Sequence, residues 1–373
     1  MIPEIPRRHF LGASAAAAFS GFLSENVFAQ EESPRSDRSP ATQTGCVFGP
    51  RRLFPDLKIT FSQTGNNVRF FIPGLRVPSK ILHLSDTHIF LDDERGKPFE
   101  RFSARMAAAY HRPTHCRTGK TTNPMAAFEE SLDFAKREKV DAVTLTGDIL
   151  SFPSEAGVDW LLEKLKTLDE AGIPWFFISG NHDWHYEGWP GTDEEKRAEW
   201  APKRLGKLYP ENANFLNYSA VVKGIRHLFV DDSIYEILPE QLRFLKAELA
   251  HGEPTVLWMH IPPYAPGRNV GFGCGHPEWG KDTDKNWQIE RREPWRAGGH
   301  TDVTFEFYET LLKAPNLLGT FCGHVHVNAL DIVNGKPFTT TEANAAAGWR
   351  VVEFLPQETY RRPAGPSPIS FLP

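Results

Sequence analysis

The chain has 373 residues, of which 40% are hydrophobic and 24% are charged, and its formal net charge is -5. This composition is typical of a globular protein with one large domain or two small ones. The mild acidity argues against a protein that binds nucleic-acid phosphates through a basic surface. No stretch reaches the ~18 consecutive apolar residues of a membrane span, which excludes a multi-pass membrane protein, and we expect no membrane span in the mature chain.

The first residues have the pattern of an export signal. Arg7 and Arg8 precede a weakly apolar run, residues 10–23, and small side chains precede a cleavage point after Ala29. The letters RRHFL resemble a twin-arginine signal, which the bacterial export machinery reads as an address. The alternatives are an ordinary secretory signal or an uncleaved N-terminal anchor. We expect a signal peptide over residues 1–29, the twin-arginine machinery as a partner, and a location in the bacterial periplasm or outside the cell.

The polar residues 30–45 carry Pro and Ser and predict a disordered linker. Residues 46–373 predict a single domain with its core over residues 79–356. The chain has four cysteines, none of them in a CxxC pair: Cys46, Cys116, Cys274 and Cys322. Because twin-arginine export carries proteins that have already folded in a reducing cytosol, we expect no structurally required disulfide.

The predicted strands and helices alternate along the chain. Residues 57–75 alternate apolar and polar positions around a Gly-Asn-Asn turn and predict a β-hairpin. After it we predict strand 80–85, helix 125–139, strand 140–147, helix 154–172, strand 173–180, two strands within 218–232, helix 239–252, strand 254–259, helix 303–314, and strands 317–323, 329–333, 336–341 and 349–354. This alternation indicates an α/β fold with a largely buried sheet, and the late run of strands indicates a second sheet packed on the first.

Five predicted strands are followed at their carboxyl ends by residues of types that bind metals. These residues are Asp86 with His88, Asp148, Asn181 with His182 and Asp183, His260, and His324 with His326. Open α/β sheets bind their ligands at this end of the strands. Because side chains two residues apart in an extended segment share a face, we expect both members of each Asp-x-His or His-x-His pair to point into one site.

The chemistry of this set indicates metal ions. Burying two carboxylates, an amide and several imidazoles together is costly without a compensating cation. Nitrogen and oxygen ligands without a thiolate suit Zn, Fe or Mn. Seven ligands exceed the needs of one tetrahedral zinc and fit two metals about 3.5–4 Å apart that share a carboxylate. We therefore expect two divalent metal ions, Fe, Mn or Zn, as cofactors.

The order Asp-x-His, Gly-Asp, Gly-Asn-His-Asp, His and Gly-His-x-His resembles the calcineurin-like metallophosphoesterase superfamily over about residues 81–354. The resemblance implies a two-sheet β-sandwich flanked by helices, αββα, with a metal site at the carboxyl ends of the strands. Its implied ligands are Asp86, His88 and His326 for the first metal, Asn181, His260 and His324 for the second, and Asp148 as the bridge. After the Gly-Asp motif, Leu150 and Ser151 stand where the Ser/Thr protein phosphatases carry Asp and Arg, and the motif lacks the tyrosine of the purple acid phosphatases. We therefore expect membership of neither subgroup.

The resemblance implies a binuclear-metal-dependent hydrolase of phosphate esters, a phosphomonoesterase or phosphodiesterase acting on a small phosphate ester. Two bound cations would lower the pKa of a shared water, so that a metal-bridged hydroxide is the nucleophile. His182 would contact the phosphate and protonate the leaving oxygen as general acid. The second catalytic candidate is Asp183, which either orients His182 or caps the helix or loop that follows. The alternatives are a Mn-dependent nuclease, a cyclic-nucleotide phosphodiesterase and a non-catalytic metal-dependent binding protein; we expect no stable nucleic-acid binding.

Three irregular segments near the predicted site, residues 92–124, 184–212 and 262–300, have the length of functional lids. Their aromatic side chains suit either substrate stacking or packing of the loops onto the sheet, and packing is the interpretation we prefer for most of them: Trp184, His185, Tyr186, Trp189, Trp279, Trp287 and Trp295. Arg291, Arg292 and Arg296 suit a second anionic group of the substrate or a solvated face. Asp231 and Asp232 close a predicted strand and suit either support of the ligands or a turn.

Overall fold

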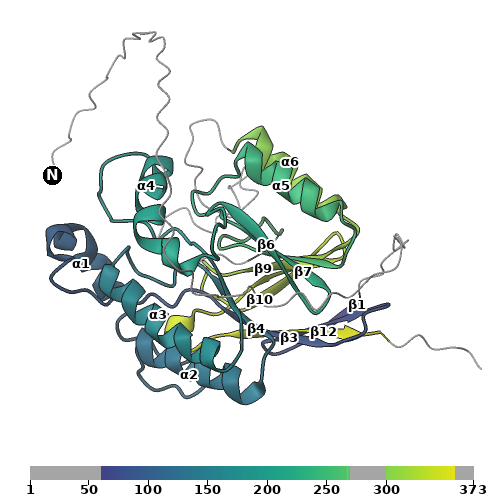
Figure 1. The fold of residues 1–373 in the computed structure, drawn as a ribbon, viewed down its shortest axis with the longest axis horizontal. Helices are drawn as coiled ribbons and strands as arrows, with labels where there is room; N and C mark the ends of the chain where they lie inside the picture. Colours follow the sequence, from purple (N-terminus) through teal and green to yellow (C-terminus); the bar gives the residue numbers. More distant parts are fainter. Residues whose placement is uncertain (1–59, 267, 269–299, 358–373) are drawn as a thin grey trace, which may run out of the picture. The chain divides into compact units, whose positions relative to one another are not determined.

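The structure is a computed structural model, and it describes residues 60–266, 268 and 300–357. Within these residues the strands form two six-stranded sheets (Figure 1). The first sheet has the order β1 (Thr60–Thr64), β2 (Asn67–Ile72), β12 (Arg350–Pro356), β3 (Ser79–Leu84), β4 (Ala142–Thr146), β5 (Trp175–Ile178). The second has the order β10 (Ala329–Val333), β11 (Lys336–Thr340), β9 (Leu317–Cys322), β8 (Thr255–Trp258), β7 (Ile225–Val230), β6 (Asn217–Val222).

The layer between the sheets is rich in aromatic side chains. The ring centroids of Trp258 and Phe321, on neighbouring strands of the second sheet, lie 4.8 Å apart. Phe70 of the first sheet meets Phe321 edge to face at 6.1 Å, and Phe70 and Phe321 are fully buried. Burial of one such side chain stabilises the fold by about 1.5–3 kcal/mol, so this layer is a principal source of stability.

Strand β12 corrects one expectation. The late strands were all expected in the second sheet; β10 and β11 belong to it, but β12 returns to the first sheet, parallel to β2 and antiparallel to β3. The physical reason is the apolar face of β12. Val352 and Phe354 are fully buried, and the Phe354 ring stacks on Phe70 of β2 at 5.6 Å.

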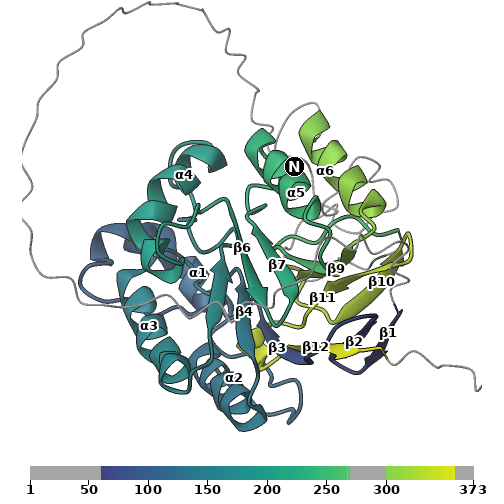
Figure 2. The same ribbon diagram turned by 45° about the vertical axis from the view of Figure 1, so that its right-hand side comes forward.

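Helices cover the outer faces of the two sheets (Figure 2). α2 (Pro124–Glu138) and α3 (Glu155–Glu170) bury Leu132 and Leu161 in the core of the first sheet. α5 (Pro239–Leu249) and α6 (Asp302–Lys313) bury Leu245 and Phe307 against the second sheet. The four helices lie where the apolar periodicity predicts them, so the αββα sandwich is confirmed.

Two further helices lie in segments that we expected to be irregular. α1 (Glu100–Ala109) buries only Ser103 and Met106, and α4 (Asp193–Trp200) begins with a capping box between Thr192 and Glu195. Both helices are short, with 10 and 8 residues, and few of their side chains are buried, so their signal in the sequence is weak. Both belong to the lid-length segments beside the predicted site.

Several expectations concern residues outside the described part of the chain. They are the signal peptide, the linker, Cys46 and Cys274, the three tryptophans between 279 and 295, and the three arginines between 291 and 296. Among the described residues, Cys116 and Cys322 are free thiols. Within the same residues, every helix is too short or too polar to cross a lipid bilayer.

One buried histidine in the layer between the sheets lies away from the predicted ligands. His227 of β7 accepts a hydrogen bond at Nδ1 from the Trp258 indole N–H, at 3.0 Å, and the two rings are stacked. Burial lowers the pKa of His227 to about 3. Because the unfolded chain binds this proton with a pKa near 6.5, the contribution of His227 to stability is complete above pH 6.5 and is lost as the pH falls towards 3.

We predict that His227→Asn flattens the pH dependence of stability. The amide oxygen of Asn replaces the Nδ1 acceptor but does not titrate. Between pH 6.5 and 3 the free energy of unfolding of the wild type should therefore fall more steeply, by about 1.4 kcal/mol per pH unit. Urea unfolding of both proteins at several pH values measures the difference, and equal slopes would show that His227 is not held neutral by burial.

Candidate metal centre

The predicted ligands lie on loops that leave the carboxyl ends of five strands, three in the first sheet and two in the second. The first ligand after each strand stands two or three residues beyond the strand end: β3 ends at Leu84 before Asp86, β4 at Thr146 before Asp148, β5 at Ile178 before Asn181, β8 at Trp258 before His260, and β9 at Cys322 before His324. The site is thus built between two sheets, and neither sheet alone supplies it.

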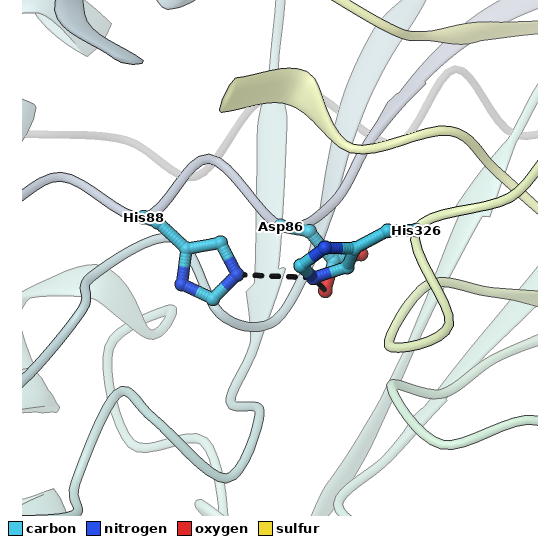
Figure 3. A group of neighbouring side chains, drawn as sticks. All are labelled: Asp86, His88 and His326. Atoms are coloured by element: carbon cyan, nitrogen blue, oxygen red, sulfur yellow. Dashed lines mark hydrogen bonds and ion pairs between the residues drawn. The ribbon is translucent and has the colours of Figure 1, made fainter. Parts of the chain in front are cut away.

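Three of these side chains form a first ligand group: Asp86, His88 and His326 (Figure 3). Their nearest polar atoms all lie within 4.8 Å of one another. The Nε2 atoms of His88 and His326 are 3.1 Å apart, and Nε2 of His326 is 3.2 Å from Oδ1 of Asp86. Figure 3 shows the three side chains pointing toward one another, Asp86 and His88 from the loop after β3 and His326 from the loop after β9.

A second ligand group contains Asp148, His260 and His324, which are all buried. Nε2 of His260 lies 3.1 Å from Oδ2 of Asp148 and 3.3 Å from Nδ1 of His324. The other nitrogen of His260, Nδ1, is 2.8 Å from the Thr146 carbonyl oxygen, which fixes the ring so that Nε2 faces the group.

The electrostatics of both groups suit cations. Burial, with His326 and His182 nearby, holds the pKa of His88 well below its usual value, so its nitrogen lone pair is available. Burial opposes protonation of His260 as well, but the Asp148 carboxylate outweighs it and raises the pKa of His260 to about 10. A metal ion at the second group would therefore displace this proton.

Asn181 adds a further argument for metal binding. Its Oδ1 atom is buried and has no hydrogen-bond partner among the described residues. A buried carbonyl oxygen without a partner is costly, and coordination of a cation removes that cost. The donor set of carboxylate, imidazole and amide oxygen fits two divalent ions. The structure thus brings together six of the seven residues we predicted as ligands in two groups, and Asn181 adds a buried oxygen that is unpaired within the described residues; the role of all seven as ligands is still a prediction.

The backbone at the ligands differs from our expectation. We expected extended segments with paired residues on one face. Instead the ligands at 86, 88, 148, 324 and 326 have φ between 50° and 68°, the left-handed region. Such a conformation costs a non-glycine residue about 1–2 kcal/mol, although Asp and His tolerate it better than most. The side chains of each pair converge because two left-handed residues alternate with a right-handed or extended one, and strain of this kind is typical of functional sites.

Two motif glycines are explained by close packing at this strained backbone. A Cβ atom on Gly180 would overlap the Asp148 carboxylate, and one on Gly323 would overlap the side chains of Ser85 and Asp86. The absence of a side chain at these positions lets the ligand loops of different strands approach one another.

His182 lies beside the first ligand group. Its ring meets that of His88 edge to face at 5.1 Å, and its backbone N–H donates to Oδ1 of Asp148 at 2.8 Å. The His182 side chain is partly exposed, and its Nδ1 is 3.3 Å from the Ser151 carbonyl oxygen. With an N–H at Nδ1 donating to that carbonyl, Nε2 is left for a ligand.

The structure corrects both expectations for Asp183. Its carboxylate accepts hydrogen bonds from the backbone N–H groups of Gly180, Asp148 and Leu150, at 2.7–2.8 Å. These donors precede Asp183 in the chain, so it neither orients the His182 ring nor caps the segment that follows. Fully buried, it joins the loop after β4 to the loop after β5. We therefore describe Asp183 as a positioning residue.

Three other residues contact the ligand loops. The Asp232 side chain accepts the backbone N–H groups of His260 and Ile261, and its carbonyl oxygen accepts the Tyr235 N–H in a turn, so Asp232 has both roles considered for it. The Tyr235 hydroxyl is 3.5 Å from Nε2 of His324. Tyr110, at the end of α1, stacks on His88 with ring centroids 3.9 Å apart. Tyr110 and Tyr235 are far in sequence from the histidines that they contact, so these contacts become visible only in the fold.

Most aromatic residues that follow the Asn-His-Asp motif pack the loops, as we preferred. Trp184 is buried and donates its indole N–H to Ser233 Oγ, and Tyr186 is buried with its hydroxyl on the Pro153 carbonyl. Trp189 packs against Phe99 and Phe102. His185 is partly buried beside Trp184.

The sequence model of the calcineurin-like phosphoesterase family matches residues 79–328, more than half of the chain. The chain therefore belongs to the calcineurin-like phosphoesterase family. It is a phosphoester hydrolase, and members of this family typically depend on a pair of metal ions. Both ligand groups contain residues within the matched range.

The chain is also similar to individual proteins. The DNA double-strand break repair protein Mre11 of Sulfurisphaera tokodaii is 29% identical over 136 residues, which are 36% of this chain and 25% of that protein. Mre11 of Saccharolobus solfataricus is 27% identical over 157 residues, 39% of this chain and 31% of that protein. The chain thus spans about a quarter to a third of these curated relatives. A dimetal phosphatase from Danio rerio has a TM-score of 0.43 and 12% identity, covering 73% of this chain and 91% of that chain.

We predict that Asp183→Asn destabilises the protein. An amide has one acceptor oxygen in place of two, so at least one of the three backbone donors would face an NH₂ group, at a cost of about 1–3 kcal/mol. Chemical unfolding measures the change. Asp159→Asn, at a half-exposed carboxylate on α3 that pairs with Arg95, is the control and should stay within about 0.5 kcal/mol. Equal effects of the two substitutions would contradict the positioning role.

Proposed function

We propose that the chain hydrolyses small phosphate mono- or diesters with two divalent metal ions. The observation that carries this proposal is the convergence of two ligand groups, with His182 beside the first of them. Asp86, His88 and His326 would hold one ion, and Asn181, His260 and His324 the other. Asp148 would bridge the two; its charge acts on the pKa of His88 as well as on that of His260, which supports a position between the groups.

When bound, two such ions supply positive charge for a phosphate and make a water molecule more acidic. The residues of the chain orient the general acid and hold the proton that the reaction needs. The Ser151 carbonyl oxygen holds the Nδ1 side of His182, so that Nε2 is directed away from the backbone. When its ring is protonated at both nitrogens, His182 would donate the proton on Nε2 to the leaving oxygen of the ester. The hydrogen bond from its backbone N–H to Asp148 keeps this ring at a set distance from the ligand groups.

A nuclease is the second candidate function. The two curated relatives are named DNA double-strand break repair proteins, and their similarity to this chain supports the idea. Against it, the net charge of -5 gives no general attraction for a polyanion. We therefore favour a small phosphate ester as the substrate.

The assay that separates these functions is a panel of phosphate mono- and diesters, with plasmid DNA, tested on protein reconstituted with Mn²⁺. We expect hydrolysis of a small ester, loss of that hydrolysis in a chelator, and intact plasmid. Nicked plasmid without hydrolysis of any small ester would favour the nuclease.

In the same assay, His182→Ala should lower kcat by about 10²–10⁴-fold because the leaving oxygen loses its proton donor. The loss should be larger for an alkyl ester than for a nitrophenyl ester, since nitrophenolate leaves without a proton. Metal content should be unchanged. His251→Ala, at an exposed histidine after α5, is the control. Equal losses for both esters would remove the general-acid assignment.

We also propose that the chain is exported by the twin-arginine route, with cleavage near Ala29 and a periplasmic or extracellular location. The support is the Arg7-Arg8 pair before a weakly apolar run. Replacing both arginines with lysine should leave an uncleaved precursor in the cytosol, as cell fractionation would measure. Export of the double variant at the wild-type rate would favour the ordinary secretory signal instead.

A further inference from the structure

The imidazole of His88 lies flat on an aromatic ring. The centroids of His88 and Tyr110 are 3.9 Å apart and their planes differ by 13°. The same tyrosine meets the His326 ring at 5.3 Å and an angle of 64°. Tyr110 thus contacts both histidines of the first ligand group. It is partly buried and immediately follows α1, a helix in one of the lid-length segments.

The histidines of the second ligand group are oriented in another way. A histidine that binds a metal is usually held by a partner on its other nitrogen. His260 has the Thr146 carbonyl at 2.8 Å, and His324 has the Tyr235 hydroxyl at 3.5 Å. Nδ1 of His88, in contrast, is buried without a hydrogen-bond partner among the described residues. The plane of its ring must therefore be fixed by packing.

Tyr110 provides this packing. The His182 and His326 rings meet His88 at angles of 86° and 62°, with centroids 5.1 Å away in both cases, so they touch it through edges. Among these contacts only Tyr110 covers a face of the imidazole in parallel. The middle of α1 also contacts the loop after His182, because Arg105 forms an ion pair with Glu187 through Nε at 2.6 Å.

We propose that Tyr110 is a positioning residue for the first ligand group. Its ring holds the His88 imidazole in the orientation in which Nε2 faces His326 and Asp86. Occupancy of the first group by a metal ion therefore depends on an aromatic ring at position 110, whereas occupancy of the second group does not. This inference rests on the proposed two-metal centre, but it concerns metal binding and not hydrolysis.

The test is a Mn²⁺ titration of metal-free protein, followed by calorimetry and by electron paramagnetic resonance. Wild type should bind two ions and give the signal of a magnetically coupled pair. Tyr110→Ala should bind one ion as tightly as wild type and the other about 10- to 100-fold more weakly. At a metal concentration that just fills both sites of wild type, the variant should lack the signal of the coupled pair. Tyr110→Phe, which keeps the ring, should behave as wild type. Arg112→Ala, an exposed position in the same segment, is the matched control.

Three results would overturn the proposal: two unchanged affinities in Tyr110→Ala, equal weakening of both ions, or the same loss in Tyr110→Phe as in Tyr110→Ala. Thermal unfolding of each metal-free variant shows whether the fold is intact, and Tyr110→Leu supplies a bulkier variant without an aromatic face that should match Tyr110→Ala. If wild type binds two ions but hydrolyses no ester, the proposed function fails while this inference stands. If wild type hydrolyses esters and Tyr110→Ala keeps both ions, only this inference fails.

Discussion

Two buried carboxylates at one end of two sheets are the constraint on which the rest of this structure depends. Asp86 is fully buried with an imidazole nitrogen of His326 at 3.2 Å, and Asp148 is 2% exposed with one of His260 at 3.1 Å. Removing carboxylates from water is expensive unless positive charge compensates. Protonated histidine supplies part of that charge in the absence of metal, since Asp148 raises the pKa of His260. Divalent ions supply it more completely, and the ligand groups have the donor types that such ions take.

The loops that carry these ligands are held together by carboxylates that accept backbone N–H groups. Asp86 accepts from His324 N–H, at 2.9 Å for Oδ2, and so joins the two sheets. Asp183 joins the loops after β4 and β5, and Asp232 holds the loop that carries His260. Each of these bonds fixes a backbone segment and not a side chain. The left-handed residues at the ligands are maintained in this way against their local preference.

The sequence was sufficient to predict the sandwich, its four covering helices and the order of the ligands, because apolar periodicity and motif spacing are local signals. It could not predict that β12 returns to the first sheet, since that depends on the contact of Phe354 with Phe70 across the chain. It also could not predict the left-handed backbone at the ligands. Tyr110 was missed because α1 is short and the residue that follows it meets His88 only in three dimensions. The role of Asp183 was not predicted because the backbone N–H groups that it accepts precede it in the chain.

The place of β12 has a consequence for how the protein is made. This strand is the last described element, yet it lies inside the first sheet, between the β1–β2 hairpin and β3. Just before it, Asn344 and Ala345 donate their backbone N–H groups to the carbonyl oxygens of Ser85 and Asp86. During synthesis the hairpin and the Asp86 loop therefore wait for residues about 260 to 285 positions later in the chain. Until those residues emerge, β2 and β3 each keep an open edge, so the first sheet is completed only after β12 has been synthesised.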